Sequence, residues 1–110
     1  MKIAVPGHPV RGSRTGRPVM VLLDLLGRRM ALRIIWELSN AETPLTFREL
    51  QNAADTNPSV LNSRLRELRE ARIVERESQG YVLTSDGQSL LNTILPLQAW
   101  ASEWASKIKR

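Results

Sequence analysis

The stretch NPSVLNSRLRELREARIVERE, residues 57–77, constrains the fold more than any other part of this 110-residue chain. Asn57 is a favourable N-cap and Pro58 suits the first helical position, so we expect a helix that runs to about Arg72. Its apolar side chains share one face: Leu61, Leu65 and Leu68, flanked by Val60 and Ala71. The pattern predicts a helix that covers a core with one side and leads directly into a strand.

The opposite face of this helix carries short polar side chains and an arginine. Its members are Ser59, Asn62, Ser63 and Arg66. Asparagine pairs with adenine and arginine with guanine in the major groove, which is about 12 Å wide and admits a helix. Arg64 and Arg69 lie on the flanks of this face, where phosphates suit them better than bases.

A solvated amphipathic helix is the alternative interpretation, with Arg66 paired to Glu70 and Arg64 to Glu67. Exposed pairs of this kind contribute only about 0.3–0.5 kcal/mol each, so they do not require this choice of residues.

The segments on either side of this helix favour DNA binding. Thr46 and Glu49 form a capping-box signature for a short helix whose buried side carries Phe47 and Leu50. After residue 72, IVERE and YVLT flank a short loop in which Gly80 can adopt a positive φ, which indicates a β-hairpin. A short helix, a tight turn, a long helix and a hairpin are the layout of a winged helix-turn-helix.

Two further helices are predicted before this unit. From Val19, the segment VMVLLDLL is apolar nearly all round, so we expect a short helix buried on most sides and ended by Gly27. The next helix ends at Asn40, and Trp36 on it either packs or lines a pocket. Its predicted core stripe consists of Ala31, Leu32, Ile34, Ile35 and Leu38.

The last helix is predicted over residues 85–109, opened by Ser85 and Gln88 as a capping box and kinked by Pro96. It has two apolar surfaces, with Leu91 and Leu95 to one side of the main stripe. The main stripe contains Leu90, Ile94, Leu97, Trp100, Trp104 and Ile108. We expect this stripe to form a dimer interface; burial of the tryptophans within their own subunit and a ligand pocket are the alternatives.

The net charge of +5 and a pI near 10.7 point toward a polyanionic partner. Residues 1–17 contain basic side chains and no acidic ones, and their Gly/Pro-rich sequence predicts a flexible basic arm, either a disordered leader or a segment that grips DNA. Residues 18–106 hold nine basic and eleven acidic residues, a net charge of −2. Any contact with nucleic acid must therefore be local.

Composition argues against several classes of function. The chain has no cysteine, and its one histidine, His8, lies in the arm, so we expect no metal site, no cofactor and no enzymatic activity. The longest apolar run is too short to span a bilayer and contains Asp24. Nothing near Met1 resembles a signal peptide, and we expect a cytoplasmic protein that does not associate with membranes.

The ordered set of motifs resembles the HxlR-type winged helix-turn-helix transcriptional regulators over about residues 19–105, with MarR-like and PadR-like proteins as more distant alternatives. The matching positions are Leu26-Gly27, Asn57-Pro58, Leu61, Arg64, Leu65, Leu68, Arg76, Leu83-Thr84 and Gly87. The resemblance implies a homodimer joined through the terminal helices, each subunit placing a recognition helix in a major groove. Family members commonly carry a cysteine near the first helix, some for sensing electrophiles, and this chain has none.

The sequence therefore predicts a mainly α fold with a small β-hairpin: a winged helix-turn-helix domain over residues 18–110 with N- and C-terminal dimerisation helices. We expect a dimeric regulator that binds double-stranded DNA with helix 57–72, its backbone contacts supplied by Arg64, Arg69, Arg76 and Arg48. A winged-helix module that binds a protein and not DNA is the rival, favoured by the −2 charge of residues 18–106. The sequence does not indicate whether a small-molecule effector binds.

Overall fold

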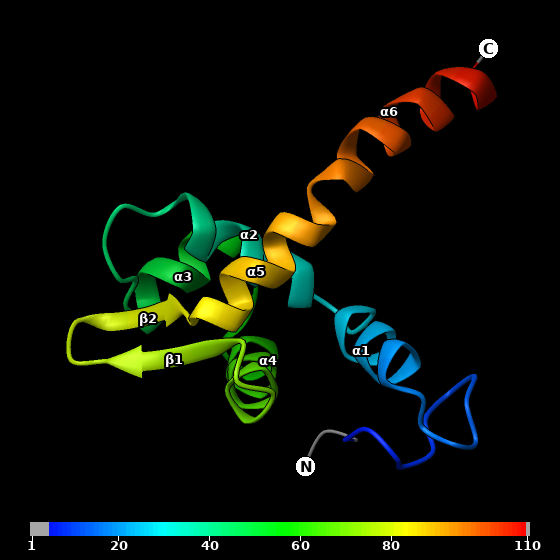
Figure 1. Ribbon diagram of the computed structural model, residues 1–110. Coiled ribbons are helices and arrows are strands. Elements are labelled where there is room, and N and C mark those ends of the chain that lie inside the picture. Colours follow the sequence, from blue (N-terminus) through cyan, green and yellow to red (C-terminus); the bar gives the residue numbers. More distant parts are fainter. Residues whose placement is uncertain (1–4, 110) are drawn as a thin grey trace.

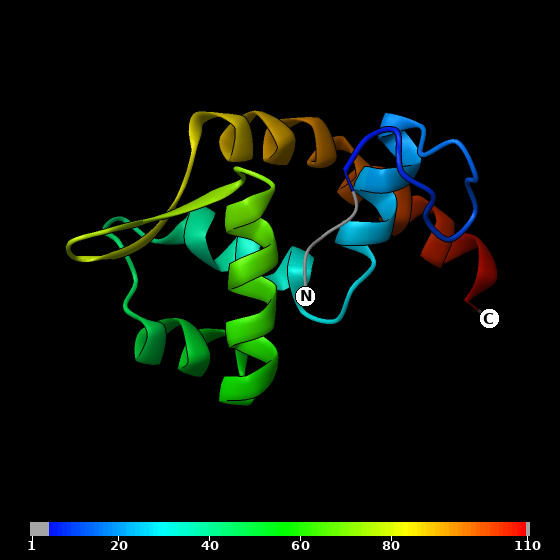
Figure 2. The same cartoon turned by 90° about the horizontal axis from the view of Figure 1, so that it is seen from below.

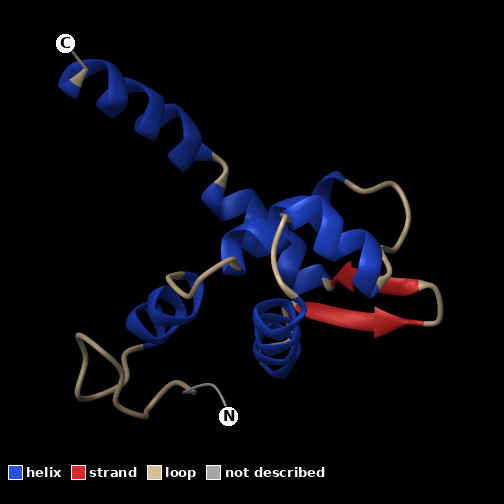
Figure 3. Ribbon diagram, turned by 180° about the vertical axis from the view of Figure 1, so that it is seen from behind, coloured by secondary structure: helices blue, strands red, loops and turns tan. Residues whose placement is uncertain are grey.

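The computed structural model describes residues 5–109, which form a mainly helical protein with one two-stranded hairpin (Figures 1 and 3). The first four helices are α1 (Pro18–Leu26), α2 (Ala31–Asn40), α3 (Phe47–Ala54) and α4 (Pro58–Glu70). They are followed by β1 (Val74–Glu77), β2 (Gly80–Leu83), α5 (Ser85–Ile94) and α6 (Pro96–Ile108). This order confirms the predicted winged helix-turn-helix fold.

Side-chain caps fix the starts of α3 and α4, as the sequence predicts. Thr46 accepts a hydrogen bond from the amide of Glu49, whose carboxylate accepts one from the amide of Thr46, so the capping box is complete. Asn57 Oδ1 accepts a hydrogen bond of 2.8 Å from the amide of Val60, and Pro58 follows at the first helical position. Both helices therefore begin where their own residues place them.

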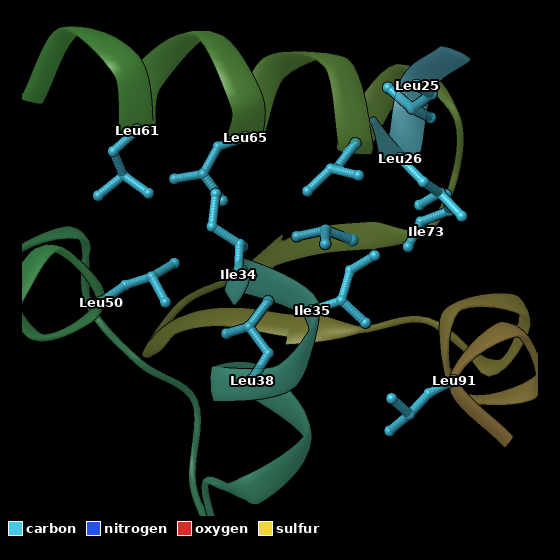
Figure 4. Close-up of a cluster of buried hydrophobic side chains, with 12 residues drawn as sticks. Leu25, Leu26, Ile34, Ile35, Leu38, Leu50, Leu61, Leu65, Ile73 and Leu91 are labelled. Carbon is cyan, nitrogen blue, oxygen red and sulfur yellow. The ribbon is translucent and has the colours of Figure 1, made fainter. Parts of the chain in front are cut away.

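The core lies where α2, α3, α4 and the hairpin meet. Figure 4 shows Leu61 and Leu65 of α4 facing Ile34 of α2, with Leu50 of α3 beside them. Leu68 and Val74 are also buried, so the leucine face of α4 continues into the first residue of β1. This burial fixes α4 about its long axis, because turning the helix would expose its leucines.

The hairpin pairs β1 with β2 in antiparallel register, from Val74 opposite Leu83 to Glu77 opposite Gly80. Gly80 has a φ of 143°, and a Cβ atom there would overlap the carbonyl of Leu45. Leu45 and Tyr81 exchange two backbone hydrogen bonds, which attach the segment before α3 to the hairpin. The positive φ predicted for Gly80 is thus confirmed.

The predicted last helix is divided at Pro96 into α5 and α6. Pro96 has no N–H to donate to the preceding turn, so α5 ends at Ile94 and the chain bends there, as the sequence predicts. The N-cap of α5 is Thr84 and not the predicted Ser85, because the hydroxyl of Thr84 accepts from the amide of Gly87. Thr84 Oγ1 also donates to the carbonyl of Arg72 at 2.6 Å.

Two burial predictions were wrong. α1 buries Val21, Leu25 and Leu26 but leaves Val19 and Leu23 more than half exposed, so it is covered on one side and not on most sides. Leu32 was assigned to the core stripe of α2 and is 45% exposed. Both helices therefore have more apolar surface than the single chain covers. Figure 1 shows α1 standing apart from the body.

Residues 5–17 form a loop closed by hydrogen bonds. The amide of Gly7 donates to the carbonyl of Gly16, and Ser13 Oγ accepts from the amides of Gly16 and Arg17. The flexibility expected for this arm stays a prediction, and residues 1–4 of it lie outside the described part of the chain. No helix among residues 5–109 has both the length and the apolar character to cross a membrane.

Candidate nucleic-acid interface

The polar face of α4 is the part of the molecule that the sequence assigns to DNA. Ser59, Asn62 and Arg66 are exposed and Ser63 is half-buried, while Leu61, Leu65 and Leu68 on the opposite face are buried. Within residues 5–109, Ser59, Asn62 and Arg66 are therefore left open to solvent, and only Ser63 is partly covered. In the view from below, α4 is visible over its full length, and α3 lies beside its first turns (Figure 2).

The turn between α3 and α4 sets the angle at which α4 leaves the body. Asp55 ends α3 with a φ of 52°, in the left-handed region, and its amide donates to the carbonyl of Asn52. The amide of Thr56 donates to the carbonyl of Gln51, which draws the chain back over the last turn of α3. Asn57 then caps α4. The geometry is that of a helix-turn-helix.

Arg64 does not lie with the other arginines of α4. Its side chain is only 18% exposed, and its Nε is 2.7 Å from Glu67 Oε1, although the N–H is not aligned for a hydrogen bond. Its Nη1 donates to the carbonyl of Arg29 at 3.3 Å. The Arg64–Glu67 pair that the alternative interpretation foresaw is therefore present, but it lies against the body and not on a solvated face.

The remaining backbone-contact candidates are exposed. Arg69 lies near the end of α4 and Arg48 in the first turn of α3, so both are near the ends of the helix-turn-helix. Arg76 extends from β1, with its guanidinium carbon 5.8 Å from the centre of the Tyr81 ring. This contact orients Arg76 along the hairpin.

Sequence reasoning missed Arg28 and the burial of Glu67. Arg28 Nη1 lies 2.8 Å from Glu67 Oε2, and the side chain of Glu67 is 5% exposed. On a helical wheel Glu67 falls beside Val60 and Ala71, at the edge of the apolar face, which is the one local sign that it turns inward. No pattern within α4 identifies its partner, because Arg28 precedes α2.

The predicted dimer face is divided between covered and open residues. Leu90 and Ile94 are half-buried against the core of their own chain, whereas the remaining members are open. Those open side chains, each at least half exposed, are Leu97, Trp100, Trp104 and Ile108. Trp100 and Trp104 stack with ring centres 6.2 Å apart but remain 59% and 50% exposed, so they are not buried within their own subunit. α6 projects away from the body (Figure 1).

A small apolar hollow lies at the base of α6. It has a volume of about 160 Å³ and is lined by Leu32, Ile35 and Trp36 of α2 and by Leu91, Ile94, Leu95 and Gln98. The hollow adjoins the exposed stripe, so apolar surface continues from the body of the protein onto α6.

Residues 25–109 match the family described as HxlR-like helix-turn-helix, which covers α2 to α6 and the hairpin. The chain belongs to the HxlR family. This membership confirms the resemblance seen in the sequence and places the chain among DNA-binding regulators of transcription.

Several relatives agree with the HxlR assignment. The chain is 24% identical over 90 residues to the HTH-type transcriptional regulator MJ0925 of Methanocaldococcus jannaschii, covering 77% of this chain and 83% of that protein. A crystal structure of a possible HxlR family transcriptional factor from Thermoplasma volcanium has a TM-score of 0.69 at 28% identity, covering 77% of this chain and 82% of that one. Quinone-bound YodB of B. subtilis has a TM-score of 0.72 at 32% identity, covering 77% and 96%.

Proposed function

We propose that this HxlR protein is a dimeric, sequence-specific regulator that reads the major groove with α4. One observation carries the proposal: Ser59, Asn62 and Arg66 are exposed on a helix whose opposite face is locked into the core. Ser63, half-buried beside them, completes the set of base-reading side chains. Asparagine and arginine at these places discriminate adenine and guanine by hydrogen bonds to base edges.

Backbone contacts are assigned to the exposed arginines at the edges of this face. Arg69, Arg48 and Arg76 are exposed on α4, α3 and β1, and as phosphate contacts they would set register without reading sequence. Arg64 was predicted in this role, but its guanidinium is engaged by Glu67 and the carbonyl of Arg29. We therefore assign Arg64 to holding α4 in place.

A second copy of the chain is proposed to cover the exposed apolar stripe. Leu97, Trp100, Trp104 and Ile108 on α6 and Val19 and Leu23 on α1 would otherwise lie open to water. Apolar patches of this kind mark association sites, and aromatic side chains are enriched in interface cores. The hollow beside Trp36 supplies a concave surface next to the stripe. Dimerisation would present two copies of α4 to one duplex.

Quinone binding is not carried over from YodB. Quinones add covalently to thiols, and this chain has no cysteine to receive one. Covalent sensing through a cysteine thiol is therefore not available to this chain.

Selection of bound duplexes from a random DNA library tests the proposal. We expect a pseudo-palindromic consensus with half-sites about 10 bp apart, one helical turn, because two copies of α4 would enter successive major grooves on one side of the duplex. Affinity for that duplex should fall with salt with a log-log slope of about −0.9 per phosphate neutralised.

The same selection separates the proposal from its rival. A protein-interaction module, which the −2 charge of residues 18–106 favours, would enrich no sequence and bind no duplex at low salt while retaining a partner protein. That result would remove both the base-reading role of α4 and the predicted operator.

A further inference from the structure

A cluster of charged side chains joins the end of α1 to the inner edge of α4. Glu67, 5% exposed, lies at its centre. Arg28 Nη1 is 2.8 Å from Glu67 Oε2, and Arg28 Nη2 donates to Asp24 Oδ2 at 3.3 Å. Arg64 Nε is 2.7 Å from Glu67 Oε1. Two arginines and two carboxylates therefore lie together with side chains that are 5–24% exposed, and the exposed Arg11 approaches Asp24 at 4.0 Å.

The same cluster holds the linker between α1 and α2. Arg64 of α4 donates to the backbone carbonyl of Arg29, and Glu67 of α4 pairs with the side chain of Arg28. The linker is therefore bound to α4 through one backbone atom and one side chain. Met30 follows with a φ of 71°, an uncommon conformation for a residue other than glycine. The linker thus has a defined path from α1 onto α4.

Apolar packing holds α1 less completely. A cavity of about 370 Å³ separates the α1 residues Pro18, Val21 and Leu22 from Ala71 and Ile73 at the far end of α4. The buried residues of α1 are Val21, Leu25 and Leu26, and the two leucines are in its last turn, shortly before Arg28 in the sequence. The charged cluster lies at this last turn, so it acts on the angle between α1 and α4 together with the packing of Val21, Leu25 and Leu26.

Charged contacts suit this role because they depend on direction. An apolar contact tolerates sliding, whereas a guanidinium holds two carboxylates only when its planar N–H groups point at both. Arg28 bridges Asp24 and Glu67 in this way, and Glu67 in turn bridges Arg28 and Arg64. A buried ion pair adds little to stability compared with apolar residues of the same shape, so stability alone does not account for this cluster.

We infer that Arg28 and Glu67 are positioning residues that fix the orientation of α4 relative to α1. The effect on DNA binding rests on the proposed function. Val19 and Leu23 of α1 belong to the face that is assigned to the second copy of the chain. With α1 held against the partner, the α1–α4 angle sets the separation of the two recognition helices. The cluster then decides which half-site spacing the dimer prefers.

A distance measurement without DNA tests the geometric part. The chain has no cysteine, so Arg17→Cys and Asn62→Cys, both at exposed positions, accept one spin label each before α1 and on α4. Mixing with excess unlabelled chain restricts the signal to distances within one chain. Glu67→Gln in this background should broaden or shift the distance distribution.

Glu37→Gln is the matched control, because it makes the same change of charge in the Arg33–Glu37 pair of α2, also 2.7 Å long. It should keep the parent distribution. Arg28→Lys is the milder second variant: it keeps the charge but has no planar fork to reach Asp24 and Glu67 together, and it decides the test if Glu67→Gln does not fold. An unchanged distribution in the folded variants would overturn the inference.

DNA binding tests the consequence. On the preferred duplex, Glu67→Gln should raise the Kd about tenfold relative to Glu37→Gln, within the range seen for residues that couple distant sites. Affinity for unrelated DNA should match that of the control, and the preference for one half-site spacing should flatten. A role in folding alone would weaken all duplexes equally, and that result, or no loss at all, contradicts the inference.

The two proposals fail in different ways. If the parent protein prefers no duplex, the proposed function is wrong, while the distance measurement still decides whether the cluster orients α4.

Discussion

At the scale of single residues, three non-glycine residues among residues 5–109 lie in the left-handed region: Met30, Asp55 and Arg72. Arg72 has a φ of 62° and follows α4, where the amide of Ile73 donates back to the carbonyl of Leu68 at 2.9 Å. This turn directs the chain from the recognition helix into β1. A side chain at such a position costs about 1 kcal/mol compared with glycine.

Arg72→Gly should therefore raise the free energy of unfolding by about 0.5–1 kcal/mol, because the strain is relieved and the turn is kept. Denaturant titration measures the change. Arg69→Gly removes the same charge from within α4 and should instead lower stability by about 1 kcal/mol. Equal effects of the two variants would show that the left-handed turn is not what matters.

Arg66 and Arg69 allow base readout and phosphate contact to be separated on one helix. Arg66→Ala should weaken binding by about 1–3 kcal/mol and relax the consensus at one base pair. Arg69→Ala should weaken binding to all duplexes alike and reduce the salt slope by about 1. Fluorescence anisotropy with single-base variants of the selected duplex distinguishes these outcomes; a uniform loss for Arg66→Ala would make it a phosphate contact.

At the scale of elements, the start of α5 is joined to the start of β1. The amide of Thr84 donates to the carbonyl of Ile73, and Gly87 packs so closely that a Cβ atom would overlap that carbonyl oxygen. Both contacts are made to Ile73, the residue directly before β1, so they hold the start of α5 against the start of the hairpin. This contact explains why a glycine stands in the first turn of a helix, where it is otherwise unfavourable.

Gly87→Ala should destabilise the protein by about 1–3 kcal/mol, because the added methyl forces α5 away from Ile73. Helix propensity alone predicts the opposite sign, so thermal unfolding gives a clear answer. Ser89→Ala, at an exposed position of α5, should stay within about 0.5 kcal/mol of the parent. Stabilisation by Gly87→Ala would show that the close packing is not maintained in solution.

At the scale of the whole molecule, α6 is expected to contribute to dimerisation and not to the folding of the single chain. All residues of α6 are exposed in the single chain, so its stripe contributes to stability only when something covers it. Trp104→Glu should give a monomer by sedimentation, with cooperative unfolding retained, because the core of α2, α3 and α4 is untouched.

The monomer should also bind the selected duplex more weakly, because a single dimer no longer occupies both half-sites at once. Ser102→Glu adds the same charge on the far side of α6 and should leave the dimer intact. A protein that is monomeric without any substitution, or a dimer that tolerates Trp104→Glu, would contradict the assignment of this face.

The sequence by itself determined the features that depend on residues close together in the chain. Thr46 with Glu49, Asn57 with Pro58, and Gly80 fix two helix starts and the hairpin within a few positions, and Pro96 bends the last helix by lacking an N–H. The leucine spacing of α4 likewise predicted which face is buried. These effects are local, so local patterns report them.

Only the tertiary structure decided what each surface meets. Periodicity shows that a face is apolar but not what covers it, so the exposure of Val19, Leu23 and Leu32 could not be read from the sequence. Arg64 and Glu67 look like a surface pair on α4, but Arg28, distant in the chain, makes them part of a mostly buried cluster. Burial of a charge depends on partners brought together by folding, and that is the physical reason why pattern alone could not assign it.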